Sequence, residues 1–262
     1  MGVDSAVRRD DWLDLARKVD WELTYVREAD AFPEDASGRP WLAGAQWRDW
    51  DEPFRTTYGE YVRGQHDKER GLAAVRDALG SAIEQRRLPR AWQYGVKLHA
   101  ATFALAEFAA TVGNLRAARF GRDSAWRSTA LLGALDETRH TQIPLALLHD
   151  LVRWDRQFDW THRLFHSNVW VAIAARHMVD EMLLTADPIE FAIAANFVFE
   201  TGFTNLQFLG LAALAGQAGD RLFERMTTSI QTDEARHAQI GPAVLAKVAA
   251  HDRARAQRLV DK

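Results

Sequence analysis

Two strings in the sequence share the pattern Asp-Glu-x-Arg-His, and its residue types are ones that bind metal ions. The first string runs from Asp136 to His140 and the second from Asp233 to His237. On an α-helix, residues three positions apart project from the same face, so the Glu and His of each string can reach one ion. A single Glu-x-x-His match arises easily by chance, but a second copy inside the same longer string does not. The pattern therefore predicts two helices that each supply one glutamate and one histidine to a metal site.

Two further glutamates complete a possible ligand set. Glu107 precedes the first string and Glu200 precedes the second, each by an interval that suits one helix, a turn and part of the next helix. Both are set among apolar neighbours, where a charge is tolerated only if a cation or an ion pair neutralises it. Bundles that hold two metal ions draw one Glu from each of two helices and Glu-x-x-His from each of the other two. The predicted ligands are Glu107, Glu137, His140, Glu200, Glu234 and His237.

The donor types predict which metal this site would hold. Carboxylate oxygens and imidazoles favour iron or manganese and leave open positions for oxygen, and we expect two iron ions. The chain has no cysteine, which excludes thiolate zinc and iron–sulfur sites of the usual kind. Within the two strings, we expect Asp136 and Asp233 to accept hydrogen bonds from the imidazoles, and Arg139 and Arg236 to balance carboxylate charge. The alternative, buried ion pairs that only tie helices together, does not explain the twofold order.

The elements that must position these residues are helices. From about Thr56 onward, apolar residues recur at three- and four-residue spacing, with almost no alternating runs. The prediction is an all-α, ferritin-like four-helix bundle with additional helices. Its helices should break at five places, which are Leu88-Pro89, Gly121 to Asp123, Asp155 to Asp159, Asp187-Pro188 and Gly219-Asp220.

The first 55 residues differ from the rest, because prolines alternate with tryptophans there. Pro33, Pro40 and Pro53 are interspersed with Trp21, Trp41, Trp47 and Trp50. We expect a single domain, in which residues 1–55 form an irregular N-terminal arm on a bundle of residues 56–262. The tryptophans are predicted to pack on the bundle, and the alternative is that some anchor a partner subunit.

Charge and hydropathy narrow the expected partners and location of the protein. The formal net charge is -3 and no Lys/Arg run stands out, so neither nucleic acid nor an anionic membrane is an expected partner. The most apolar segments are too short to span a bilayer, and the N-terminus has no apolar stretch of signal-peptide length. A cytoplasmic protein is therefore expected.

Several strings resemble the hydroxylase alpha subunits of bacterial multicomponent di-iron monooxygenases, closest to the toluene monooxygenase branch. They are Phe199 to Asn205, Ser229 to Glu234, Asp155 to Trp160 and His166 to Asn168. The resemblance implies that Glu107, Glu137 and His140 bind one iron, that Glu200, Glu234 and His237 bind the other, and that Glu137 bridges the two. It also implies insertion of one oxygen atom of O2 into an aromatic or alkene substrate.

The resemblance also implies roles around the metal site. Thr204 matches a threonine that assists proton delivery, and Asn205 and Gln231 match polar residues near the metal site. For Thr204, the alternative is a hydroxyl that bonds back to a helix carbonyl. The implied substrate pocket is lined by Phe103, Ala106, Ala110, Phe199 and Phe208, for which the alternative is ordinary core packing. Because Phe103 and Ala106 stand where relatives often carry Ile and Gly, we expect a narrower cavity.

By the same resemblance, the chain would depend on other proteins. Hydroxylase beta and gamma-type subunits, an effector protein, a ferredoxin and an NADH-dependent reductase are implied, with a small hydrophobic substrate. The family's alpha subunit continues well beyond the last ligand, so we expect a shortened or split relative.

Two other functional interpretations are compatible with the same six ligands. A radical carrier of the ribonucleotide reductase type would place a tyrosine one turn after His140, where this chain has Pro144. A ferritin-like store, or a shortened non-catalytic subunit, is the alternative outside enzymes.

Overall fold

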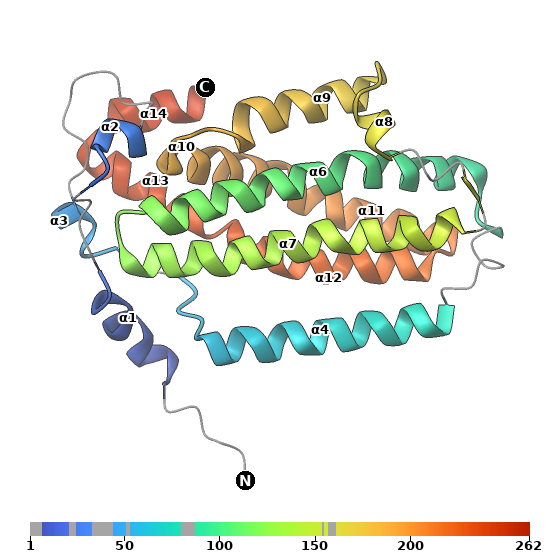
Figure 1. Ribbon diagram of the computed structural model, residues 1–262, viewed down its shortest axis with the longest axis horizontal. Helices are drawn as coiled ribbons and strands as arrows, with labels where there is room; N and C mark the ends of the chain where they lie inside the picture. The colour runs from blue at the N-terminus through green and yellow to red at the C-terminus, as the bar shows by residue number, and fades with distance from the viewer. Residues whose placement is uncertain are drawn as a thin grey trace, which may run out of the picture.

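The computed structural model describes residues 7–20, 25–32, 44–50, 53–79, 87–153, 155–156 and 161–262. Four long helical segments form the bundle (Figure 1): α6 (Arg90–Phe120), α7 (Ser124–Val152), η3 with α11 (Ala192–Thr204 and Asn205–Ala218), and α12 (Arg221–His237). The described residues contain no strand. The prediction of an all-α bundle is confirmed.

Four of the predicted breaks separate helices in the described residues, and capping residues explain three of them. Further breaks that the sequence did not predict lie between α8 and α9, between α12 and α13, and between α13 and α14. Asp123, Asp187 and Asp220 each accept a hydrogen bond from a backbone N–H in the first turn of the next helix. At the end of α11, Gly219 has φ 84°, a left-handed conformation that ends helices and that glycine adopts without strain. The break predicted at Asp155 to Asp159 falls largely outside the described residues; α7 ends at Val152 before it and α8 (Thr161–Phe165) follows it.

The segment that carries Glu200 is a π-helix, where the sequence predicted only a helix. η3 spans thirteen residues and runs on from α10 (Pro188–Phe191) into α11. At the start of α11, the side-chain amide of Asn205 donates to the Glu200 carbonyl of η3 at 2.9 Å. π-Helical segments re-aim side chains relative to an α-helix, and they are frequent at functional sites. A second π-helix, η2 (Val179–Leu183), follows α9 (Trp170–Met178).

Additional helices cover the bundle. In Figure 1, α4 (Tyr58–Leu79) lies along one side of α7 and α12, while α9 lies along α6 on the opposite side. α13 (Ile240–His251) packs on η3 and is followed by α14 (Arg253–Asp261). The site between the four central helices is therefore covered by α4 on one side and by α9 on the other.

The described part of the N-terminal arm contains α1 (Arg9–Arg17), α2 (Glu28–Ala31) and α3 (Gly44–Trp47). Trp47 is fully buried and stacks on Trp126 of α7 with ring centroids 5.3 Å apart, and Trp50 lies 6.5 Å from the same ring. These two tryptophans pack on the bundle. Trp21, Trp41, Pro33 and Pro40 lie outside the described residues. The division into an arm of residues 1–55 and a bundle stays a prediction.

None of the helices in the described ranges combines the length and the apolar character that a bilayer crossing requires.

Candidate metal centre

The four bundle helices bring all six predicted ligands together. Two overlapping groups form, one with Glu107, Glu137, His140 and Glu234 and one with Glu137, Glu200, Glu234 and His237. Within each group the potential ligand atoms lie within 4.8 Å of one another, and every member is buried. The close approach of so many carboxylates, far from solvent, is the arrangement expected of a site for two cations.

Both imidazoles point the same ring nitrogen into the carboxylate cluster. Nδ1 of His140 lies 2.9 Å from Glu234 Oε1, 3.2 Å from Glu137 Oε2 and 3.6 Å from Glu107 Oε2. Nδ1 of His237 lies 3.0 Å from Glu137 Oε1 and 3.8 Å from Glu200 Oε1. The Nδ1 atoms are therefore the imidazole donors available to metal ions.

Two glutamates belong to both groups. Glu137 comes from α7 and Glu234 from α12, and each reaches both histidines. The resemblance predicted a bridging role for Glu137 alone. The arrangement makes Glu234 available as a second bridge, and the assignment of each ligand to one ion stays a prediction.

The aspartates of the two motifs pair with the histidines in a crossed manner. Nε2 of His140 lies 3.3 Å from Asp233 Oδ2, and Nε2 of His237 lies 3.0 Å from Asp136 Oδ2. Each imidazole is thus oriented by the aspartate of the other motif, on the other helix. A carboxylate on the outer nitrogen fixes the tautomer that leaves the inner nitrogen free for a metal.

The arginines of the motifs hold these aspartates in place. Arg139 donates to Asp233 at 3.1 Å and to the Ser229 hydroxyl at 2.6 Å, while Arg236 is ion-paired with Asp136. Each arginine therefore helps to balance the charge of the aspartate of the other motif.

Helix α4 contributes residues that sequence reasoning missed. The Tyr61 hydroxyl donates to Asp136 at 3.0 Å, the Gln65 amide donates to Asp136 at 2.7 Å and to Asp233 at 3.0 Å, and Lys68 is ion-paired with Asp233. The signal in the sequence is their i, i+4, i+7 spacing, which places three polar side chains on one face of a helix. α4 thereby joins the two crossed pairs.

Burial and mutual repulsion disturb the titration of the cluster. Burial raises the pKa of Glu107, Glu200 and Glu234, and neighbouring carboxylates add to the effect. Burial alone would lower the pKa of His237, but the charge of Glu137 and the other glutamates outweighs it and raises this pKa to about 9. The four clustered carboxylates thus favour a positive charge among them, on an imidazole or on a bound cation.

The residues present fit two metal ions. Among the described residues, Glu200 Oε2 is buried without a hydrogen-bond partner, which is costly unless a cation binds there. Four glutamates and two imidazoles supply hard oxygen donors and nitrogen donors of the kind that iron or manganese takes.

A cavity of about 480 Å³ adjoins the carboxylate cluster. Glu107, Glu137, Glu200 and Glu234 form part of its wall, and most of the rest is apolar. Of the predicted pocket residues, four line it, namely Phe103, Ala106, Ala110 and Phe199. Phe208 does not line the cavity; it stands behind Phe103 with the ring centroids 5.1 Å apart, edge to face. The predicted narrowness stays a prediction.

Thr204 also lines this cavity and is 1% exposed. Its hydroxyl has no hydrogen-bond partner among the described residues, so the alternative of a bond back to a helix carbonyl is not observed. Asn205 makes that bond instead, and Gln231 donates to the Asn205 side-chain oxygen at 3.2 Å. Asn205 and Gln231 therefore support η3 from outside the cavity wall.

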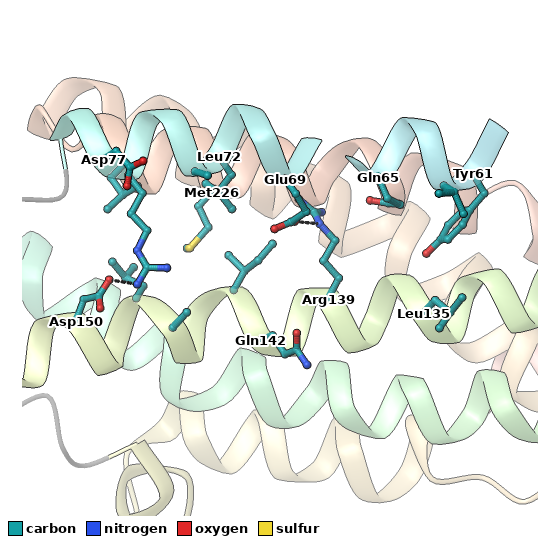
Figure 2. Close-up of a pocket in the computed structure, with 17 residues that line it drawn as sticks. Tyr61, Gln65, Glu69, Leu72, Asp77, Leu135, Arg139, Gln142, Asp150 and Met226 are labelled. Atoms are coloured by element: carbon teal, nitrogen blue, oxygen red, sulfur yellow. Dashed lines mark hydrogen bonds and ion pairs between the residues drawn. The ribbon is translucent and has the colours of Figure 1, made fainter. Parts of the chain in front are cut away.

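A second cavity, of about 720 Å³, lies between α4, α7 and α12 (Figure 2). Tyr61, Gln65 and Glu69 project from α4 toward it, and Arg139 reaches across from α7 to pair with Glu69. Asp150 of α7 lies near its other end (Figure 2) and is ion-paired with Arg76. The two cavities thus lie on different sides of the carboxylate cluster.

These features define an all-helical bundle protein with adjoining Glu/His groups that can hold two metal ions. Residues 21–252 match the family model for methane, phenol and alkene hydroxylases. The chain belongs to this family.

Three relatives show the extent of the similarity. The oxygenase alpha subunit of the Xanthobacter autotrophicus alkene monooxygenase is 44% identical over 97% of this chain and 51% of its own length. The phenol 2-monooxygenase oxygenase component of a Pseudomonas species is 31% identical over 90% of this chain and 45% of its own length. The crystal structure of phenol hydroxylase from Pseudomonas sp. OX1 superposes with a TM-score of 0.81 at 28% identity, covering 97% of this chain and 51% of that one. The chain spans about half the length of the curated relatives it matches.

Proposed function

We propose that this chain is the dioxygen-activating part of a hydroxylase, which inserts one oxygen atom of O2 into an aromatic or alkene substrate. The other oxygen atom leaves as water, with two electrons and two protons supplied from outside. One observation carries the proposal: the predicted ligand glutamates form part of the wall of a largely apolar cavity. A small hydrocarbon held there would lie beside the metal ions. The alkene and phenol monooxygenase relatives support this substrate class.

The side chains around the cavity would have three separate roles in this reaction. Glu107, Glu137, His140, Glu200, Glu234 and His237 would hold two iron ions, which when bound supply the reduction of dioxygen. Asp136 and Asp233 keep each histidine turned with Nδ1 toward the ions. Apolar residues exclude water from the reacting carbon, which limits side reactions.

Thr204 is the residue that we expect to handle a proton. Its hydroxyl lines the cavity and has no hydrogen-bond partner among the described residues, so it is free to donate to or accept from a group at the site. Asn205 and Gln231 would support this role from behind, because they brace the π-helical segment that presents Thr204.

Electrons must come from other proteins. The relatives are oxygenase components of multicomponent systems, which implies further subunits and a reductase. We propose hydroxylase beta and gamma-type subunits, an effector protein, a ferredoxin and an NADH-dependent reductase as the partners. The cytoplasmic location expected from the sequence stays a prediction.

Iron binding and turnover together test this function. Anaerobic ferrous loading should give two iron ions per chain, and Glu234→Gln should remove at least one because it takes a donor from both groups. The matched control is Glu224→Gln on the same helix, where Glu224 pairs with Arg221 near the surface. With a supplied reductase system, the loaded protein should convert an alkene or phenol to an oxygenated product that carries 18O from 18O2. Fewer than two irons, or product without the label, would contradict the proposal.

A further inference from the structure

One wall of the apolar cavity carries an imidazole that the metal site does not use. His99 lies on α6 eight residues before Glu107, a separation of about 12 Å along the helix axis. Its side chain lines the cavity and is 9% exposed. The end of the cavity away from the carboxylate cluster therefore contains a buried polar group.

His99 makes no side-chain hydrogen bond or ion pair with any other described residue. Its ring instead contacts three phenylalanines: it stacks on Phe103 with centroids 4.7 Å apart, and Phe208 and Phe223 meet it edge-on at 6.5 Å and 5.5 Å. A buried polar group without a partner is costly, so a ligand that hydrogen-bonds to it gains affinity.

The hydroxyl donor of the neighbouring cavity residue Thr102 is already engaged. The Thr102 hydroxyl also lines the cavity, but it donates to the backbone carbonyls of Leu98 at 3.0 Å and His99 at 3.2 Å. Among these two neighbours, His99 is thus the one with a hydrogen-bond donor to spare.

The imidazole is neutral in its aromatic surroundings. Burial lowers the pKa of His99 to about 4, so at neutral pH one ring nitrogen is a donor and the other an acceptor. Either nitrogen can pair with a hydroxyl group, which both donates and accepts, whereas a hydrocarbon can pair with neither.

We propose that His99 recognises the hydroxyl group of a phenol-type ligand in this cavity and thereby favours hydroxylated aromatics over hydrocarbons of the same shape. The proposal rests on the proposed function, in that the cavity is taken as the substrate cavity. His99 acts here as a positioning residue: the ligand ring packs in the apolar wall while the hydroxyl fixes which ring edge faces the carboxylate cluster.

Phenol and toluene form a suitable probe pair, because they are nearly equal in shape and differ in the group that would meet His99. Equilibrium dialysis of each ligand against the purified chain gives two dissociation constants and needs no turnover. We expect His99→Phe to weaken phenol binding about tenfold and to leave toluene binding within about twofold, since the ring stack on Phe103 is kept and only the hydrogen bond is lost.

Two further variants separate recognition from packing. His99→Asn, which restores a donor and an acceptor, should recover part of the preference for phenol. Thr102→Val removes a hydroxyl of the same wall whose proton is already donated to backbone carbonyls, and it should leave the ratio of the two constants unchanged. In a spectrum of 15N-labelled protein, phenol but not toluene should shift the His99 ring nitrogens.

An equal ratio of phenol to toluene affinity in the wild type and His99→Phe would overturn the proposal. So would failure of the wild-type chain to bind either ligand. Both results are independent of iron content, so they are distinct from a failure of the oxygenase function, which the iron and 18O measurements report.

Discussion

At the scale of single residues, the centre is held by pairings between the two motifs rather than within them. Asp136 orients His237, and Asp233 orients His140, so neither Glu-x-x-His pair is positioned by its own helix alone. Each aspartate is shared with an arginine and with Gln65 of α4. A substitution at one aspartate should therefore alter the orientation of the histidine in the other motif.

Substitution of Asp233 tests this coupling. Asp233→Asn keeps the shape of the side chain but removes the charge that faces His140, Lys68 and Arg139, and we expect iron affinity to fall about 10- to 100-fold. Competition with a chelator measures the affinity. The control Asp150→Asn removes a carboxylate that pairs with Arg76 and His149 and with no metal ligand, and it should leave affinity unchanged. An Asp233→Asn affinity within about twofold of the wild type would show that the crossed pair does not orient the ligand.

The hydroxyl of Thr204 gives a second test at this scale. Thr204→Val keeps the volume and removes a hydroxyl that no described residue engages, so we expect stability and iron content to stay near the wild-type values. Product formation per electron consumed should fall several-fold if the hydroxyl handles a proton, with the remaining electrons recovered as hydrogen peroxide. An unchanged yield would argue that Thr204 only fills space.

At the scale of elements, the π-helical segment decides where Glu200 and Thr204 point. α13 packs on η3 so closely that Gly241 meets its backbone directly: a Cβ at Gly241 would lie 2.3 Å from the Phe197 backbone nitrogen. Only glycine allows this approach, because backbone atoms cannot turn aside as a flexible side chain can. α13 therefore supports the segment that presents a ligand to the metal site.

Gly241→Ala should separate α13 from η3. We expect a loss of about 1–3 kcal/mol in the free energy of unfolding, measured in denaturant, and weaker iron binding because Glu200 is displaced. The control is Gly210→Ala in α11, where a Cβ meets nothing within 4 Å; there we expect equal or slightly greater stability. Equal stability of the two variants would show that the contact is not needed.

At the scale of the whole molecule, the bundle encloses an acidic centre between two cavities on different sides. α9 and η3 border the apolar cavity, whereas α4 borders the second cavity, which is shown in Figure 2. The centre carries four buried glutamates, whose repulsion opposes folding unless cations bind. The bundle corresponds to about half the length of the alkene and phenol monooxygenase relatives.

Sequence by itself determined the residue types of the centre, the helical class and most ends of the four central helical segments. Ligand spacing and capping residues act within one helix, over a few positions, and such local geometry is readable from the order of residues. The crossed aspartate pairs, the part played by α4, the π-helical turn around Glu200 and the unpartnered imidazole of His99 were decided only by the tertiary structure. Each depends on which faces of separate helices meet, and that is set by packing between segments far apart in the chain.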